Sequence, residues 1–403
     1  MAIAVSDAQE ILTEMVAANA HVQAGYDANP TLALFKKVKF TGKHYDYEIQ
    51  YSKGSNRTRT GSTALAKTNK PKRIEFNVKP RRSYAAQDVE SQALDEVTGA
   101  NAFVDMLDNL LDNLNSDLVN MVGEDVYKNN GAARGQVAEV VSSTVIRLAN
   151  PSDIVRWQVD DEAASAETDG TSGSLQSGTA TVTAVDRDAI TLTTDGSGWV
   201  AQISSLDVDD YLFNVGEFGQ GRDGFPAWIP DTTSGLGGTF NGAVRSADPT
   251  RLAGCRQTVA DGTGVVQAIR DLVKRIQREG GKPDSVAMST ELAAELETEL
   301  DNRVQYEELP TDIGIKVPSI RIMTAGLKLN VVTDRSCRDD GFYVFRKDKL
   351  EIIHSTKQLV DIDDRDGKVL SRNSSEYSYD VRAESRCNFI IREPWHFGVG
   401  LFA

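Results

Sequence analysis

The sequence predicts an α+β fold that carries a small all-β domain inserted into a larger one. Two segments, 44–51 and 72–79, alternate polar and apolar residues with the period of a β-strand. Residues 100–128 instead show the apolar stripe of an amphipathic helix. Over 137–218 the pattern changes to short β runs separated by Gly- and Asp-rich breaks, and it changes back afterwards. This change on both sides predicts a small β-barrel or sandwich within a mixed body.

The elements before the long helix are predicted from local patterns. Ser6 and Gln9 have the spacing of a capping box, which predicts a short amphipathic helix over 5–20. The alternating segments predict a two-stranded ribbon with a flexible tip, and about 18 residues per arm would reach roughly 60 Å. Such a ribbon is marginal alone, so we expect it to rest on another surface; a disordered basic loop is the alternative. Its apolar residues are Tyr45, Tyr47, Ile49, Tyr51, Ile74, Phe76 and Val78.

The long helix and the β segment follow. The helical stripe steps by three and four residues, and Asn130-Gly131 ends the helix. The residues of that stripe are Phe103, Leu107, Leu110, Leu114, Leu118 and Met121. We expect residues 160–178 to form an exposed loop of the β segment. Its predicted strands are Thr144–Leu148, Ile154–Val159, Thr179–Asp186 and Ala189–Thr194, the last two forming a hairpin.

The remaining chain alternates connections, helices and strands. Residues 219–262 are a Gly- and Pro-rich connection. An amphipathic helix is predicted over 264–279 and a further, acidic helix over 290–302. Further predicted elements are strands at Leu329–Thr333 and Phe342–Arg346 and a hairpin turn at Asp366-Gly367.

Charge is distributed unevenly along the chain, whose net charge is −15. Residues 36–82 hold fourteen basic and three acidic residues, a net charge of +11; residues 137–218 hold three basic and fourteen acidic ones, a net charge of −11. Such opposed segments favour a charge-complementary contact, within one chain or between copies. Two solvated surfaces that never meet are the alternative. The candidate contact residues, at the ribbon tip, are Arg57, Arg59, Lys67, Lys70, Lys72 and Arg73.

No motif supports an enzymatic, cofactor-binding or metal-binding prediction. GQGRDG at 219–224 fits G-x-G-x-x-G, but the proline-containing FPAWIP follows where a phosphate site needs a helix to begin. The acidic cluster before Gly367 lacks the spacing of a Ca²⁺ loop and predicts a solvated turn. The histidines form no H-x-x-x-H pair and the cysteines no C-x-x-C pair. We expect no catalytic residue, cofactor or metal, and neither a membrane span nor a secretory signal.

The order of these elements resembles the major capsid protein of tailed bacteriophages, a fold shared with encapsulin shells. The resemblance implies a phage major-capsid fold with an arm, an extended loop, a long spine helix, and peripheral and axial domains. The stretches that carry it are GYDANPTLALFKKVKF at 25–40, DVESQALDEVTGANAFVDMLDNLLDNL at 88–114, GFPAWIP at 224–230, AVRSADPTRLAG at 243–254 and YDVRAESRCNFIIREPWHFGVG at 379–400.

The resemblance also implies how the chain is divided, and the β segment departs from the minimal fold as an insertion domain. The implied divisions are an arm at 1–40, an extended loop at 41–86, a peripheral domain at 87–136 and 346–385 whose spine helix lies within 88–128, the insertion domain at 137–218, a linker at 219–236, and an axial domain at 237–345 and 386–403.

The implied function is structural: a protein, not an enzyme, that self-assembles into an icosahedral capsid shell around packaged viral double-stranded DNA. The arm and the basic extended loop would contact neighbouring subunits in hexamers and pentamers. The expected partners are further copies, a separate scaffolding protein, a portal and a decoration protein, with DNA enclosed without sequence-specific binding. We expect assembly in the host cytoplasm and a final location in the virion.

Two other functions stay open at this point. An encapsulin-like cellular compartment would use the same fold and would contain a cargo enzyme. A nucleic-acid-binding module would use residues 36–82, with phosphate contacts from the bases and stacking on Tyr45, Tyr47, Tyr51, Phe76 and Tyr84. Some capsid proteins cross-link through a loop lysine and an asparagine, but no motif here identifies an acceptor, so we do not infer that activity.

Overall fold

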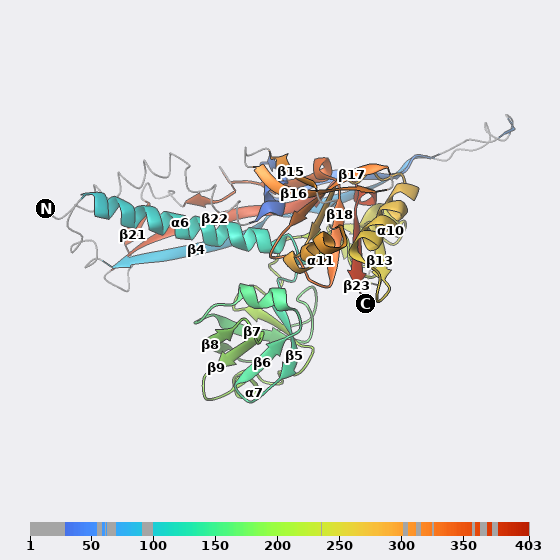
Figure 1. Cartoon of the computed structure of the whole chain (residues 1–403). Helices are drawn as coiled ribbons and strands as arrows, with labels where there is room; N and C mark the ends of the chain where they lie inside the picture. The colour runs from blue at the N-terminus through green and yellow to red at the C-terminus, as the bar shows by residue number, and fades with distance from the viewer. Residues whose placement is uncertain are drawn as a thin grey trace.

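The computed structural model shows an elongated molecule with three parts (Figure 1). A long helix (α6, Ala100–Asp125) and two long strands (β4, Arg81–Glu90, and β22, Ser378–Ile391) extend to the left in this view, and a mixed sheet with helices forms the centre. A small barrel lies below the centre. A narrow segment projects from the opposite side. The described residues are 29–54, 59–60, 62, 70–90, 100–234, 236–300, 305–311, 316–324, 326–356, 359–362, 369–372 and 378–402. The helix predicted over 5–20 lies outside them.

Helix α6 (Ala100–Asp125) confirms the predicted long helix and spans about 39 Å. It lies along strands β4 (Arg81–Glu90) and β22 (Ser378–Ile391), which pair antiparallel over ten residues. The range expected to contain the spine helix starts at residue 88. Residues 88–90 belong to β4 instead, and α6 is described from Ala100. Its described buried face is Leu110, Leu111, Leu114, Leu118, Val119 and Val122, whereas Met121 is only half-buried.

Strand β22 is the centre of a six-stranded sheet that joins distant parts of the chain. Strand β1 (Lys36–Lys39) runs parallel to β19 and places the start of the described chain on this sheet. The other strands antiparallel to β22, besides β4, are β19 (Leu350–His354), β20 (Asp361–Ile362) and β21 (Leu370–Arg372). The expected Asp366-Gly367 turn lies outside the described residues. The described strands on either side of it, β20 and β21, each pair antiparallel with β22.

His354, at the end of β19, pairs with Lys39 of β1 in the parallel register of the two strands. Burial lowers the pKa of His354, and the nearby charges of Lys37 and Lys39 on β1 lower it further. A histidine whose pKa is lower in the folded than in the unfolded state stabilises the fold fully above about pH 6.5, and this stabilisation is lost as the pH falls through the folded pKa. Protonation would place a further positive charge beside a strand that already carries Lys36, Lys37 and Lys39.

We therefore expect the thermal midpoint and the hydrogen-exchange protection of β1 to fall between pH 7 and pH 5. The substitution His354→Gln keeps a donor for the Thr356 carbonyl oxygen, 3.2 Å from Nδ1, and should weaken this dependence. An unchanged pH slope in the variant would show that His354 is not the responsible group.

A seven-stranded mixed sheet forms the central part, in the order β13–β23–β18–β14–β17–β16–β15. Helices α10 (Val265–Arg278) and α11 (Thr290–Leu300) confirm the predicted amphipathic helix and the predicted acidic helix, and they pack on one face. The other face meets Phe225 and Tyr127, with Phe225 stacked on Tyr343 at 5.1 Å. The strands are β13 (Cys255–Val259), β14 (Ser285–Met288), β15 (Gln305–Pro310), β16 (Lys316–Thr324), β17 (Leu327–Thr333), β18 (Gly341–Phe345) and β23 (Gly398–Phe402).

The inserted β segment is a closed six-stranded barrel, in the order β10–β5–β6–β9–β8–β7. It has its own core, which includes the fully buried Trp157 and Trp199. The predicted hairpin is confirmed, because β8 and β9 pair antiparallel. The strands are β5 (Gly135–Val140), β6 (Val145–Leu148), β7 (Glu162–Ala166), β8 (Ala180–Asp186), β9 (Thr191–Thr194) and β10 (Tyr211–Asn214).

Two predictions within this segment are wrong. The strand expected at Ile154–Val159 is instead the 3₁₀ helix η1 (Pro151–Arg156), because Pro151 fixes a helical φ and the Asn150 side chain accepts from the Ser152 amide. The exposed loop expected at 160–178 contains the buried strand β7, whose small residues pair with β10 and let the barrel close.

Short elements complete the fold. After the barrel, α8 (Phe225–Trp228) gives one helical turn where FPAWIP was expected to prevent a regular helix. The others are α3 (Pro30–Ala33), α7 (Trp199–Gln202), α9 (Pro249–Ala253), η3 (Lys347–Lys349), η4 (Pro394–His396), and strands β11 (Thr239–Phe240) and β12 (Ala243–Val244).

Candidate functional site

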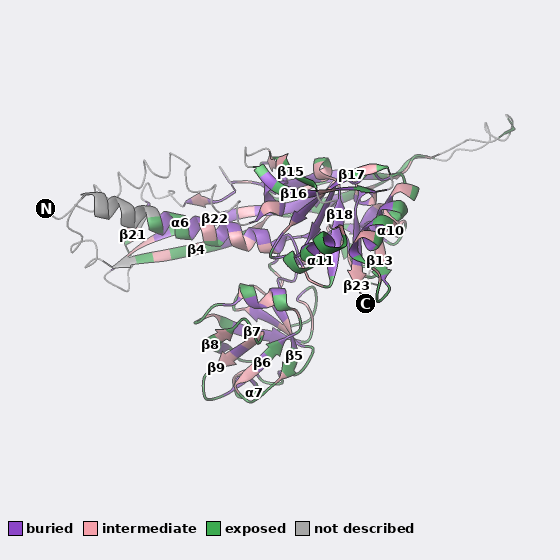
Figure 2. Cartoon of the chain, in the orientation of Figure 1, coloured by how far each residue is buried: buried purple, intermediate pink, exposed green. Residues whose placement is uncertain are grey.

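The ribbon is formed by β2 (Tyr45–Ser52) and β3 (Lys72–Val78), which pair antiparallel with each other alone. Its foot rests on the body, as expected for a two-stranded ribbon. Phe76 is fully buried, with its ring centroid 5.6 Å from Tyr47, 5.4 Å from Trp228 and 6.5 Å from Phe240. Figure 2 shows the ribbon changing from buried at the body to exposed beyond it. The foot is therefore anchored in the core, and the described residues farthest from it, such as Arg59 and Lys70, are exposed.

Burial of the foot removes one proposed use of its aromatic residues. Tyr47 and Phe76 are inside the core, so they cannot stack with nucleic-acid bases. Tyr45 is engaged within the chain: Arg392 donates a hydrogen bond to its hydroxyl oxygen at 2.7 Å and lies over its ring. Tyr84 is 64% exposed but belongs to β4, on the sheet rather than the ribbon. Tyr47 and Phe76 are therefore not available for stacking, and that part of the prediction is wrong.

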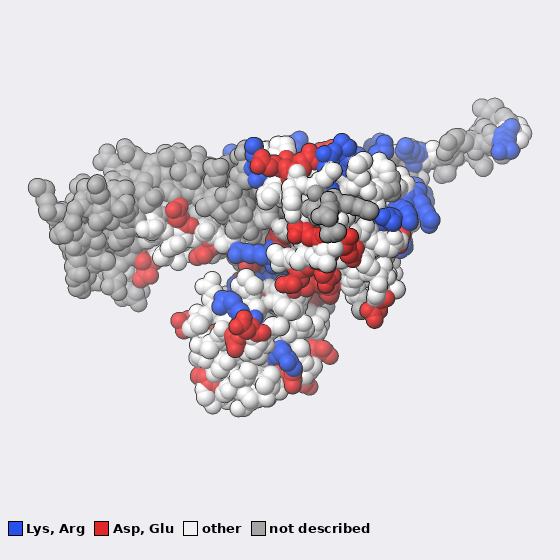
Figure 3. Space-filling model, in the orientation of Figure 1, with Lys and Arg blue, Asp and Glu red and all other residues white. Residues whose placement is uncertain are grey.

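Four of the six predicted contact residues lie among the described residues. Arg59, Lys70, Lys72 and Arg73 are all exposed, and Figure 3 shows basic side chains at the far end of the projecting segment. Arg73 pairs with Glu48 across the ribbon at 3.2 Å. For the other three, the described part of the chain provides no ion-pair partner. Arg57 and Lys67 lie outside the described residues.

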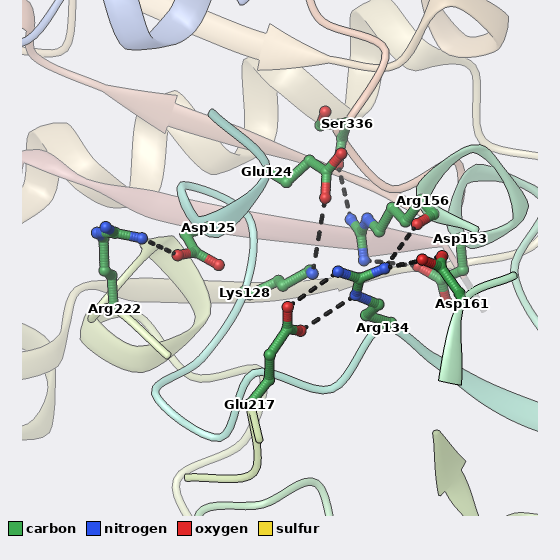
Figure 4. Close-up of polar contacts among 10 residues, drawn as sticks. All are labelled: Glu124, Asp125, Lys128, Arg134, Asp153, Arg156, Asp161, Glu217, Arg222 and Ser336. Carbon is green, nitrogen blue, oxygen red and sulfur yellow. Dashed lines mark hydrogen bonds and ion pairs between the residues drawn. The ribbon is translucent and has the colours of Figure 1, made fainter. Parts of the chain in front are cut away.

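A second charged region joins the barrel to the body (Figure 4). Arg134 stands where the chain enters the barrel and Glu217 where it leaves, and their side chains form two hydrogen bonds of 3.1 and 2.9 Å. Arg134 also pairs with Asp161 at 3.2 Å and donates to the Arg156 carbonyl oxygen. We call this contact the clamp. It holds together the segments that enter and leave the barrel, because the guanidinium group of Arg134 at the entry binds the carboxylate of Glu217 at the exit.

Further contacts fix the barrel against the central sheet. Arg156 pairs with Asp153 at 2.8 Å and donates to the Ser336 carbonyl oxygen at 3.3 Å. Burial raises the pKa of Asp153 and lowers the pKa of Lys128, which lies 3.9 Å from Glu124. These groups border a cavity of about 380 Å³ between barrel and sheet. No cluster suited to a metal ion occurs among the residues that the structure describes.

The G-x-G-x-x-G stretch has a structural role that the sequence did not reveal. Arg222 is only 1% exposed and pairs with Asp125 at the end of α6, with 2.6 Å between Nη1 and Oδ2. It also donates to Ser83 Oγ at 2.8 Å and Cys387 Sγ at 3.2 Å. The arginine thereby joins α6, β4 and β22, the three long elements of the extended side. The sequence offered one signal for this role: two adjacent charged residues, Arg222 and Asp223, stand in an otherwise apolar and Gly-rich connection.

All three cysteines are buried, and for Cys255 and Cys337 burial also disfavours the reactive thiolate form. Burial raises the pKa of Cys255 to about 11 and raises that of Cys337 well above its ordinary value. Thiols in such surroundings stay protonated at neutral pH and are poor nucleophiles. No helix among the described residues is long and apolar enough to cross a membrane.

No protein-family model and no curated protein sequence matches the chain. Its fold, in contrast, is similar to solved structures. A chain of the cyanophage A-1(L) capsid asymmetric unit matches 93% of this chain and 92% of its own length, with 12% identity and a TM-score of 0.54. The capsid of a native GTA particle covers 94% and 90% at 9% identity, TM-score 0.46. An encapsulin complex from Synechococcus elongatus PCC 7942 covers 93% and 86% at 6% identity, TM-score 0.44. The likeness to the cyanophage chain extends over nearly the whole molecule, and this protein therefore has the α+β fold of a phage capsid subunit, with an inserted barrel.

Proposed function

We propose that this protein is the major capsid protein of a virus-like shell, a structural subunit that assembles into an icosahedral container for double-stranded DNA. The single observation that carries the proposal is the ribbon, whose foot is locked into the core while its basic distal part projects from the body. A protruding ribbon gains packing partners when a neighbouring copy lies beneath it. The phage capsid fold supports the same conclusion.

The proposed division of labour follows the expected segments. The arm at 1–40 and the extended loop at 41–86 would cross to neighbours. Residues 87–136 with 346–385 would form the peripheral domain, and 237–345 with 386–403 the axial domain, joined by the linker at 219–236. Hexamers and pentamers would close the shell with help from a scaffolding protein and a portal. The barrel at 137–218 would stand clear of these contacts, available to a decoration protein.

Imaging of the purified full-length protein tests the proposed function. We expect rings or closed shells in negative stain, in equilibrium with subunits by size-exclusion chromatography. Shells of uniform size from this protein alone would remove the need for a scaffolding protein. A compact monomer at every concentration, with scaffolding protein from the same source added, would contradict the proposal. A copurifying cargo enzyme would indicate an encapsulin-like compartment, and salt-dependent DNA binding by subunits would indicate the nucleic-acid-binding alternative.

We also propose that the ribbon tip docks on an acidic surface of a neighbour. Arg59→Glu with Lys70→Glu should lower shell yield several-fold at low salt and less at high salt, since exposed pairs contribute about 0–1 kcal/mol each and are screened. Many repeated contacts in a lattice add up, so small changes per pair become measurable. The control is Arg147→Glu with Arg187→Glu on the barrel, which changes the net charge equally. Equal yields for wild type and tip variant would exclude this role.

A further inference from the structure

Two helices of the central part carry charged stripes of opposite sign. On α10, Arg270, Lys274 and Arg278 follow one another at intervals of four residues, and all three are exposed. On α11, Glu291, Glu295 and Glu299 have the same spacing and exposure, and the helix has no basic residue. Residues four apart lie on one face of a helix, so each stripe is about 12 Å long. The two stripes therefore match in length and oppose in charge.

Among the described residues of one chain no ion pair joins the two stripes, and of the three stripe acids only Glu299 contacts α10, through backbone amides of its first turn. Lys274 pairs with Asp271 of its own helix at 2.9 Å, and Arg270 donates to the neutral Gln267. No ion pair joins a base of α10 to an acid of α11, both helices being fully described. Like charges four residues apart destabilise an isolated helix slightly, and each stripe repeats this arrangement. A partner of opposite charge would remove that repulsion.

The relative orientation of the stripes is fixed by a contact between the helices. Both carboxylate oxygens of Glu299 accept hydrogen bonds from the first turn of α10, from the Val265 amide at 2.6 Å and the Val266 amide at 2.9 Å. The two helices also share one apolar core against the sheet. Figure 3 shows basic side chains along α10 at one edge of the body and acidic ones around α11 toward its middle. The stripes are thus held on separate faces of a rigid unit.

The basic face is also hollowed. A depression of about 590 Å³ is lined by Gln257, Asp271, Lys274, Arg275 and Arg278. Arg275 is held beside it by a hydrogen bond to the Arg256 carbonyl oxygen. Three basic side chains and a single carboxylate thus surround a space that accepts an acidic side chain from outside.

We propose that the basic stripe of α10 docks on the acidic stripe of α11 in the next copy of this chain. A contact between two different faces of identical subunits is head-to-tail, and it closes into a ring when the rotation per subunit permits. The inference rests on the proposed function and adds the pairing of surfaces that builds each ring. Charge complementarity sets the partner: a second copy provides an acidic stripe of equal length and spacing.

Two charge-reversal variants of the full chain test this pairing. The first, Arg270→Glu with Lys274→Glu, makes both stripes acidic; the second, Glu291→Lys with Glu295→Lys, makes both basic. Each variant alone should require at least about tenfold higher concentration to form rings or shells at low salt, as measured by sedimentation and negative stain. The control Glu167→Lys with Asp188→Lys lies on exposed barrel positions, matches the second variant in charge, and should assemble like wild type.

A mixture of the two variants distinguishes the loss of the contact between subunits from the misfolding of a subunit. In a one-to-one mixture every basic stripe finds an acidic one if the variants alternate, so assembly should recover to within about threefold of wild type. Alternation closes only even-numbered rings, so six-membered rings should return and five-membered rings should not. A misfolded variant could not be rescued in this way; if a reversal prevents folding, Arg270→Gln with Lys274→Gln should still weaken assembly about threefold.

The outcomes distinguish the two proposals. Wild-type assembly thresholds in both single variants, or no recovery in a mixture of folded variants, would overturn the stripe pairing and leave the proposed function standing. If wild type itself forms neither rings nor shells under any condition, the proposed function fails, and the pairing fails with it.

Discussion

Replacing Arg222 by alanine is expected to lower the free energy of unfolding by about 3–5 kcal/mol, because it leaves Asp125 buried without its counter-charge. Ser83 and Cys387 lose the same partner. Urea denaturation of the unassembled subunit, followed by circular dichroism, measures the change. The loss should be smaller at pH 5 than at pH 8. Burial raises the pKa of Asp125, so without Arg222 that carboxyl group can take up a proton as the pH falls.

The double variant Arg222→Met with Asp125→Leu is the matched control. Replacing both members of a buried ion pair by apolar residues of similar size is often neutral, so most of the stability should return. A loss below about 1 kcal/mol for Arg222→Ala, or a double variant as unstable as the single one, would show that the pair does not hold α6, β4 and β22 together.

Phe76→Ala is expected to cost about 3–5 kcal/mol and to release the ribbon from the body. The ring of Phe76 is fully buried among Tyr47, Trp228 and Phe240, and Trp228 is itself fixed by a 3.1 Å hydrogen bond to the Phe389 carbonyl oxygen. Removing the ring leaves a cavity at the foot. Hydrogen exchange of the β2 and β3 amides should rise far more than that of α10. Shell assembly should fail, because an unanchored ribbon no longer points at a neighbour.

Two control variants test whether the effect of Phe76→Ala comes from the loss of the buried ring. Phe76→Leu should lose under about 1.5 kcal/mol and still assemble, since it keeps an apolar side chain at the foot. Glu75→Ala, on the exposed face of the same strand, should change stability by no more than about 0.5 kcal/mol. Unchanged exchange of the ribbon in Phe76→Ala would mean that its position does not depend on the aromatic foot.

Local periodicity was enough to predict the elements whose buried faces are continuous in the sequence. Helices α6 and α10 present apolar residues at helical spacing, and the foot of the ribbon alternates as a half-buried strand does. The barrel was predicted as a change of period, although three of its six strands, β5, β7 and β10, were missed. Strand β7 consists of Glu, Ala and Ser, which are not typical strand residues. It forms because its small side chains fit inside the closed barrel, where it pairs with β10.

The candidate contact surfaces were predictable in part. Net charge along the chain located the basic ribbon tip, because exposed bases need no tertiary information to be counted. The stripes on α10 and α11 could be read from four-residue spacing, but only the structure places them on separate faces without an internal ion pair. The clamp of Arg134 on Glu217 could not be predicted, since its partners are 83 residues apart.

The sequence by itself determined the long helix, the anchored ribbon and the presence of an inserted β module, because each depends on a pattern of burial within a short window. Tertiary structure alone decided that residues 81–90 form a strand, because this largely polar stretch becomes a β-strand only through pairing with β22. It also decided that Arg222 is a core residue. A buried charge is tolerated only where its partner arrives from another part of the chain, and no local pattern records that meeting.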